Sequence, residues 1–160
     1  MNLTAVIMAG GKGERFWPRS RRNTPKQFLQ LVGDRTMLQM TVDRIRPLVS
    51  VDRVFVVTGR EYAELVLGQL PELPPSNLIL EPEGRDTAPC IGLAALHVES
   101  AYPGAVMLVL PADHLIEKEE EFGELLLAAA RAADQGDALV TLGITPTSPE
   151  TGYGYIQCGE

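Results

Sequence analysis

Short apolar runs alternate with amphipathic stretches along this chain. Five runs of branched and aliphatic residues are short enough for strands of a parallel sheet that is buried on both faces: 4–8, 54–58, 78–80, 106–110 and 138–144. Between them, apolar residues recur at helical spacing. Strands that alternate with helices predict an α/β fold, with a mostly parallel sheet and helices on both of its faces.

Local signals mark where the predicted helices begin and end. Thr36 and Gln39 have the spacing of a capping box, so a helix should follow Thr36. Asp86 or Thr87 is placed to cap another helix, whose first turn contains Pro89. The other two predicted helices cover 61–70 and 119–136.

Composition excludes several classes of protein. The chain has 160 residues, 45% of them hydrophobic, and a formal net charge of -7, which argues against a general nucleic-acid-binding surface. It shows neither a transmembrane span nor a signal peptide, so we expect no membrane partner and a cytoplasmic location. Cys90 and Cys158 lie far apart without a CxxC pair, which favours two ordinary thiols, and Cys90 should pack in a helix.

The loop after the first strand runs against the acidic balance of the chain. It concentrates six basic residues: Lys12, Arg15, Arg19, Arg21, Arg22 and Lys26. Glycines in the same loop allow backbone N–H groups to approach an anion closely. Phe16 stands where a GxGxxG dinucleotide fingerprint needs glycine, and the chain has no Walker A motif. The loop therefore predicts a phosphate site of another kind.

Five segments carry a resemblance to a known family: "GGKGERFWP", "TPKQF", "EPEGRDTAPCIGLAAL", "LVLPADHLI" and "TGYGYI". In this order they resemble the sugar-nucleotide pyrophosphorylases, or nucleotidyltransferases, and within them the guanylyl branch that acts on mannose 1-phosphate. The resemblance implies a Rossmann-like nucleotidyltransferase fold. It also implies the reaction of GTP with mannose 1-phosphate to give GDP-mannose and pyrophosphate, with Mg²⁺ as cofactor.

The resemblance also implies site residues. The catalytic set is Arg15, Lys26 and Asp113, with Asp113 also in the metal site. The nucleotide-binding set is Ala9, Gly10, Gly11, Gly13, Glu81, Asp86, Thr87 and Ala88. Gly152 and Tyr153 are placed to contact the sugar or simply to turn the chain, and Asp86 stands where many relatives have Asn.

The chemistry of the reaction agrees with these residue types. In-line attack of a sugar phosphate on the α-phosphorus of GTP needs positioning and charge neutralisation rather than a protein nucleophile. Arg15 and Lys26 can neutralise phosphate charge, and Asp113 follows an apolar run, so its carboxylate should emerge at the carboxyl end of a strand, where it can help to hold Mg²⁺. Guanine presents two neighbouring donors, N1–H and the N2 amine, which a carboxylate such as Glu81 can accept.

The resemblance further implies that the family continues beyond residue 160. We therefore expect 1–160 to be the nucleotide-binding portion of an apparently truncated catalytic domain, without the sugar-phosphate portion, and with an open sheet edge that permits homo-oligomers. Three alternatives stay open. They are a cytidylyl- or uridylyltransferase for another sugar or alditol phosphate, a molybdopterin-type guanylyltransferase, and a catalytically silent module that binds a GDP-sugar.

Overall fold

A single parallel sheet organises the protein. The computed structural model describes residues 1–11, 16–136, 138–152 and 154–159. The strands are β1 (Leu3–Met8), β2 (Val54–Gly59), β3 (Leu78–Glu81) and β4 (Val106–Pro111), in the spatial order β3-β2-β1-β4. All neighbouring pairs are parallel. The predicted α/β fold with a parallel sheet is confirmed.

The α-helices of the described residues connect or follow the strands. They are α1 (Met37–Ile45), α2 (Ala63–Gln69), α3 (Thr87–Ala101) and α4 (Glu119–Gly136). Short 3₁₀ turns accompany them: η2 (Lys26–Phe28), η3 (Val51–Arg53), η4 (Arg60–Tyr62) and η5 (Pro75–Asn77). None of the helices in the described part of the chain is long and apolar enough to cross a membrane.

The predicted start of α1 is confirmed. Asp86 also stands at the predicted cap position of α3, but without the capping hydrogen bond. The Thr36 hydroxyl accepts a hydrogen bond from Gln39 N–H, and the Gln39 side chain accepts one from Thr36 N–H, so the capping box is complete. At α3, Asp86 occupies the cap position, but its side chain makes no capping hydrogen bond. Its φ of 64° is a left-handed conformation that non-glycine residues adopt rarely.

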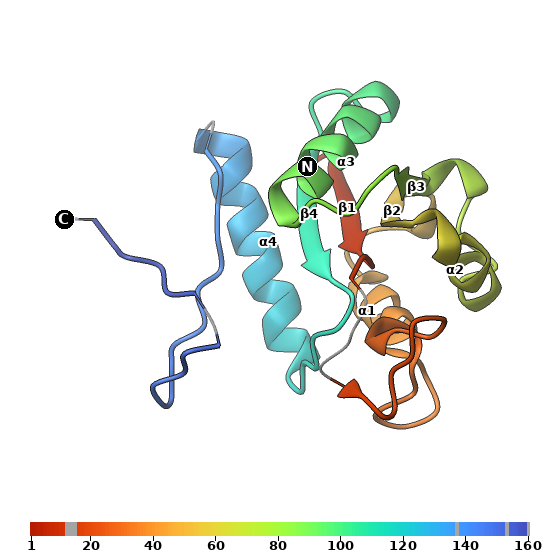
Figure 1. Ribbon diagram of the computed structural model, residues 1–160. Helices are drawn as coiled ribbons and strands as arrows, with labels where there is room; N and C mark the ends of the chain where they lie inside the picture. The colour runs from red at the N-terminus through yellow and green to blue at the C-terminus, as the bar shows by residue number, and fades with distance from the viewer. Residues whose placement is uncertain (12–15, 137, 153, 160) are drawn as a thin grey trace.

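The two faces of the sheet pack against different helices. Along β1 the side chains alternate, as a strand requires, so that Ala5 and Ile7 belong to one core cluster and Val6 to the other. The first cluster includes side chains from α1, α2 and α4, and the second includes Cys90, Ala94 and Val98 of α3. Helices therefore cover both faces, as Figure 1 shows. The predicted packing role of Cys90 is confirmed.

The strand order also indicates where a ligand should bind. The chain moves from β1 outward to β2 and β3, and then returns to the opposite side of β1 as β4. Such a reversal opens a crevice at the carboxyl ends of the two strands that flank it. Here these strands are β1 and β4, whose last residues, Met8 and Pro111, lie side by side in the register.

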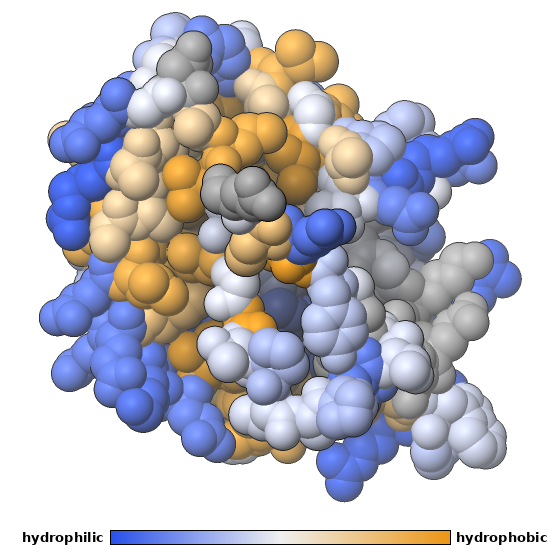
Figure 2. Space-filling model, turned by 90° about the vertical axis from the view of Figure 1, so that its left-hand side faces the viewer, coloured by the Kyte–Doolittle hydropathy of each residue, from blue (hydrophilic) through white to orange (hydrophobic). Residues whose placement is uncertain are grey.

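The fifth predicted strand, 138–144, is wrong in this structure. The segment has no strand structure and is exposed, with Leu139 and Ile144 among its exposed apolar residues. A strand is stable only when its backbone groups find a ladder partner, and the register pairs β4 with β1 alone in the described part of the chain. The described residues after α4, 138–152 and 154–159, are called the tail here. Figure 1 draws the tail to the left of α4, away from the sheet, and Figure 2 shows hydrophobic residues gathered on this left-hand face of the molecule.

Candidate functional site

Lys26 and Asp113 meet beyond the carboxyl ends of β1 and β4. Lys26 opens the η2 turn after Pro25, and Asp113 lies two residues beyond the end of β4. The Lys26 ammonium donates to the backbone oxygen of Asp113 at 3.1 Å and to its carboxylate Oδ2 at 3.3 Å. The Lys26 side chain is 21% exposed and that of Asp113 is 44% exposed. Two residues that are 87 positions apart in sequence thus form one charged pair at the switch point.

Ala9, Gly10 and Gly11 follow directly after β1 at the same edge of the sheet. Gly11 has a φ of +97°, a conformation that glycine adopts without strain. The Ala9 carbonyl accepts hydrogen bonds from the Gln27 amide at 2.8 Å and from the Thr58 hydroxyl at 3.0 Å. These contacts fix the direction in which the glycine segment leaves the sheet.

Gln27 is a residue that the sequence analysis missed. It is buried, and its Nε2 also donates to the Gly11 carbonyl at 3.3 Å. Gln27 therefore links the backbone next to Lys26 to the glycine segment. Its position directly after Lys26, in an otherwise apolar "QFL", was the available signal, because a polar side chain buried there needs partners.

Tyr62 anchors the basic loop from outside. Its hydroxyl donates to the Arg22 carbonyl at 3.0 Å, and its ring packs against Phe28 with 5.7 Å between the ring centroids. Burial, and then the neighbouring Glu61 carboxylate, raise the pKa of Tyr62 above its ordinary value, so the hydroxyl stays a donor. The loop is thus attached to η4 rather than only to its own ends.

Glu81, the last residue of β3, lies against the glycine segment from the β2–β3 side of the sheet. A Cβ atom placed on Gly10 would lie 3.0 Å from Glu81 Oε2, so the carboxylate lies directly against the glycine segment. Burial raises the pKa of Glu81 above its ordinary value of 4.5, while a hydrogen bond with Cys90 lowers it in part. Burial, and then Glu81, raise the pKa of Cys90 to about 11, which keeps this thiol protonated.

The start of α3 lies beside Glu81, because Cys90 belongs to the first turns of this helix. Asp86, Thr87 and Ala88 are all exposed at this end. The first N–H groups of a helix have no partner within it and carry partial positive charge. The predicted residues Ala9, Gly10, Gly11, Lys26, Glu81, Asp86, Thr87, Ala88 and Asp113 therefore line neighbouring parts of one edge of the sheet.

The remaining predicted residues are not brought to this edge or lie outside the described residues. Gly152 is exposed in the tail, where its N–H donates to the Glu150 carboxylate at 2.8 Å. Gly13, Arg15 and Tyr153 fall outside the described residues. The prediction that Gly152 contacts a sugar remains untested.

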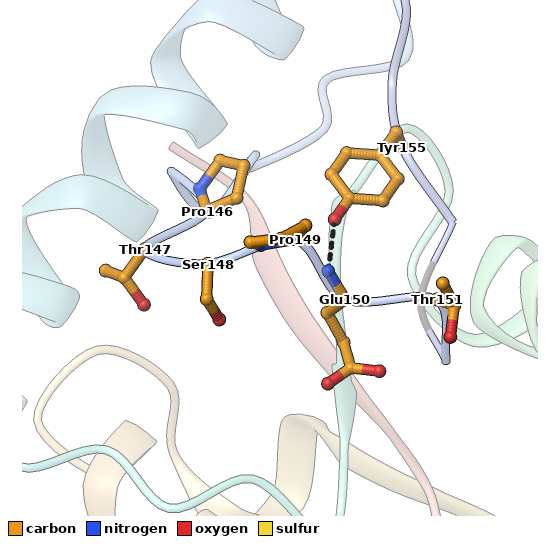
Figure 3. Close-up of a pocket in the computed structure, with 7 residues that line it drawn as sticks. All are labelled: Pro146, Thr147, Ser148, Pro149, Glu150, Thr151 and Tyr155. Atoms are coloured by element: carbon orange, nitrogen blue, oxygen red, sulfur yellow. Dashed lines mark hydrogen bonds between the residues drawn. The ribbon is translucent and has the colours of Figure 1, made fainter.

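The tail forms a hollow of its own. Its volume is about 840 Å³, and it is lined by Pro146, Thr147, Ser148, Pro149, Glu150, Thr151 and Tyr155. Figure 3 shows the Tyr155 hydroxyl accepting a hydrogen bond from Glu150 N–H, at 2.9 Å. All seven residues come from one loop, so the hollow is separate from the Lys26–Asp113 pair.

The fold is an α/β domain with a parallel sheet whose strand order reverses at β1, and in folds of this kind ligands bind at the carboxyl ends of the strands beside such a reversal. Residues 4–160 match the family model described as Nucleotidyl transferase, and the chain belongs to this family. The predicted resemblance is confirmed.

Similar proteins agree with this assignment. Over 159 residues the chain is 50% identical to a mannose-1-phosphate guanylyltransferase of Escherichia coli, covering 98% of this chain and 33% of that protein. It is 48% identical to the xanthan biosynthesis protein XanB of Xanthomonas campestris pv. campestris (strain ATCC 33913), covering 99% and 34%. A crystal structure from Thermus thermophilus, described as a mannose-1-phosphate geranyltransferase, superposes with a TM-score of 0.74 at 41% identity, covering 85% of this chain and 39% of that one. The chain thus spans about a third of the length of the curated relatives.

Proposed function

We propose that this chain binds GTP along the carboxyl edge of its sheet, and that the complete gene product transfers the guanylyl group to mannose 1-phosphate. The products would be GDP-mannose and pyrophosphate. One observation carries the proposal. Lys26, Asp113 and the glycine segment lie together at the switch point, and the Glu81 carboxylate lies against Gly10. The 50% identity to a mannose-1-phosphate guanylyltransferase supports the choice of substrates.

Lys26 acts on phosphate charge in this proposal. Its ammonium is paired with Asp113, and the next residue, Gln27, is hydrogen-bonded to Ala9 and Gly11 of the glycine segment. A phosphate oxygen that enters the crevice can replace Asp113 as its acceptor, because a phosphate carries more charge than one carboxylate. The ammonium then stabilises the charge that moves onto the leaving pyrophosphate, or it holds the attacking sugar phosphate. Arg15 is proposed to share this role.

Asp113 fits a Mg²⁺ site in which the protein supplies few of the metal ligands. Nucleotidyltransferases of this type generally use a divalent metal. Among the described residues no group of three His, Cys, Asp or Glu side chains is placed to hold a metal. Mg²⁺ commonly takes one or two carboxylates and completes its shell with phosphate oxygens and water, so the half-exposed Asp113 is a suitable ligand. When bound, the ion would supply neutralisation of phosphate charge.

Glu81 is proposed to read the base. Its carboxylate accepts, and guanine offers two adjacent donors, whereas adenine presents an acceptor at N1. Partial burial strengthens such a contact relative to one in water. Thr87 and Ala88 complete the base pocket from the start of α3, while the base contact of Asp86 is proposed on position alone.

We assign 1–160 to the nucleotide side of the catalytic domain. The sugar-phosphate side is proposed to come from the portion that relatives have and this chain does not span. Gly152 and Tyr153 would then contact the sugar from the tail. Cytoplasmic location and homo-oligomers remain expectations, as does the absence of nucleic-acid and membrane partners.

The test is a matrix of nucleotides and sugar phosphates with the complete gene product. Pyrophosphate release and GDP-mannose formation should occur with GTP and mannose 1-phosphate, and should be much slower with ATP, CTP, UTP or with glucose 1-phosphate. Preference for CTP or UTP, or GTP binding without any turnover, would contradict the proposal in favour of one of the alternatives. Residues 1–160, assayed in parallel, should bind GTP weakly and form negligible GDP-mannose.

A further inference from the structure

The face of one aromatic ring covers the Lys26 ammonium. Lys26 Nζ lies 4.6 Å from the centroid of the Phe16 ring, within the range of a cation–π contact. The same ammonium also donates hydrogen bonds to the carbonyl and the carboxylate of Asp113. A lysine in a loop is ordinarily well exposed, but here the side chain is only 21% exposed. The ammonium therefore has two partners of different kinds, an aromatic ring and Asp113.

The two contacts differ in what an incoming phosphate does to them. Asp113 uses N–H donors of the ammonium, so it competes directly with a phosphate oxygen. The ring face attracts the positive charge through its quadrupole and accepts no N–H that the phosphate requires. Phe16 can thus keep its contact while Asp113 is exchanged for phosphate.

We propose that Phe16 is a positioning residue. Its ring face holds the Lys26 ammonium beside Asp113, in the position where the ammonium can bind a phosphate of GTP. This inference rests on the proposed function, in which Lys26 meets GTP. Phe16 itself is 41% exposed, so its ring is not required to fill the core. The attraction between the aromatic ring and the ammonium, rather than the volume of the side chain, is what positions Lys26.

The next residue in the chain provides a matched control. Trp17 is also an exposed aromatic, at 74%, but the cation near its ring is Arg21, at 5.9 Å. The Arg21 side chain is occupied by the Pro18 and Ser20 carbonyls. Trp17 is therefore an exposed aromatic residue next to Phe16 whose ring lies near Arg21 instead of Lys26.

The test measures GTP affinity of the complete gene product while the ring face is weakened in steps. Phenylalanine with one, two or three ring fluorines at position 16 keeps its shape and loses attraction for a cation. A partly exposed cation–π contact predicts that affinity falls progressively, by about two- to fivefold over the series, and that Phe16→Leu falls within the same range. Trp17→Leu should leave affinity unchanged. Equal affinity across the fluorinated series would overturn the inference, because a purely hydrophobic role does not follow ring electronics.

A double-mutant cycle separates this inference from the proposed function. Lys26→Met alone should lose most GTP affinity, and Phe16→Leu added to it should cost nothing further, since Phe16 acts through Lys26. If Lys26→Met binds GTP normally, the proposed function fails. If Lys26→Met is impaired but Phe16→Leu costs the same in both backgrounds, only the role of Phe16 is wrong.

A second readout needs no nucleotide. Acylation of Lys26 by an amine-directed reagent, followed by mass spectrometry, should be faster in Phe16→Leu than in the parent by about two- to fivefold. The reaction needs the lysine nitrogen to release its proton to solvent and attack the reagent, and without the ring the charged form is held less strongly and the nitrogen is less covered. Lys118, which pairs with Glu121 on the surface, serves as the internal reference. An unchanged ratio of Lys26 to Lys118 modification would contradict the contact.

Discussion

The candidate site has a phosphate side and a base side, and they differ in how the charged side chains are compensated. On the phosphate side, defined by Gly10, Lys26 and Asp113, a largely covered cation and a half-exposed anion compensate each other. On the base side, defined by Glu81 and Cys90, a carboxylate is partly removed from water, and no cation lies within ion-pair distance among the described residues. The partner that compensates this carboxylate is a thiol.

This difference matches what each side is proposed to bind. A triphosphate brings a large negative charge, so a site for it needs a cation that can exchange its carboxylate partner for a phosphate oxygen. A base brings only neutral donors, and a carboxylate binds them more selectively where water competes less. Variants that remove one side at a time should therefore affect different steps.

The phosphate side should give the largest effect. Lys26→Ala removes the cation that stabilises transferring charge, and we expect kcat/KM to fall by about 10²- to 10³-fold. Pyrophosphate release by the complete gene product is the measurement. Lys118→Ala, which removes a surface lysine paired with Glu121, should stay near the parental rate. If Lys26→Ala kept the parental kcat/KM, the proposed role of Lys26 on the phosphate side would be wrong.

Asp113→Asn should come next. The change keeps the shape and removes the charge, so kcat/KM should fall about 100-fold and the Mg²⁺ concentration for half-maximal rate should rise. Asp43 is the matched control, because it is similarly exposed, at 39%, and is paired with Arg35 and Arg46. If the two variants showed the same metal dependence, Asp113 would be only an ion-pair partner.

Thiol reactivity sharpens the description of the base side. With a pKa of about 11, roughly one Cys90 in a thousand is ionised at pH 8, and the group is buried as well. Iodoacetamide should therefore modify the exposed Cys158 about 100-fold faster than Cys90, as followed by peptide mass spectrometry. Comparable rates would mean that the first turns of α3 open readily.

Base choice should change by a smaller factor. Glu81→Gln places an amide where guanine presents donors, and we expect the preference for GTP over ATP to fall about tenfold, with the phosphate contacts intact. Glu83→Gln, which alters a neighbouring loop acid paired with Arg85, is the control. Competitive binding measures the ratio, and an unchanged ratio would assign base reading to backbone groups or to Thr87.

The pH dependence of binding gives the smallest effect. The base contact requires ionised Glu81, and burial raises the pKa of this carboxyl above 4.5, so GTP affinity should begin to fall at a higher pH than for an ordinary glutamate. The sign for stability is opposite. The protonated acid suits the folded state, so Glu81 contributes stability below about pH 4.5 and loses that contribution as pH rises through its raised pKa. Both dependences should vanish in Glu81→Gln, as measured by calorimetry and thermal unfolding.

Sequence patterns predicted the four strands of the described sheet and the start of α1 because those signals are local. Branched apolar runs and the Thr36–Gln39 pair need no knowledge of distant residues. The segment 138–144 has the same local pattern as β4, yet only one of them pairs. Pairing depends on a partner strand, which a local pattern does not contain.

The candidate site divides in the same way. Lys26, Asp113 and Glu81 were predicted from residue type, position after a strand and resemblance. The contact of Lys26 with Asp113 and Phe16, and the roles of Gln27 and Cys90 as hydrogen-bonding partners, were not predicted. These contacts join segments that the sheet order brings together, and side-chain direction at the end of a turn is not encoded in spacing.

The central place of β1 has a consequence during synthesis on the ribosome. Ala5 pairs with Val54 on one side and with Leu108 on the other, so the first strand to emerge is the last to be enclosed. At a translation rate of 5–20 residues per second, the roughly 50 residues between β2 and β4 take about 3–10 s. During this interval the nascent chain presents one open edge of an apolar strand, and Lys26 lacks its acidic partner. Chaperones that bind extended apolar segments would therefore find this protein most accessible just before β4 leaves the exit tunnel.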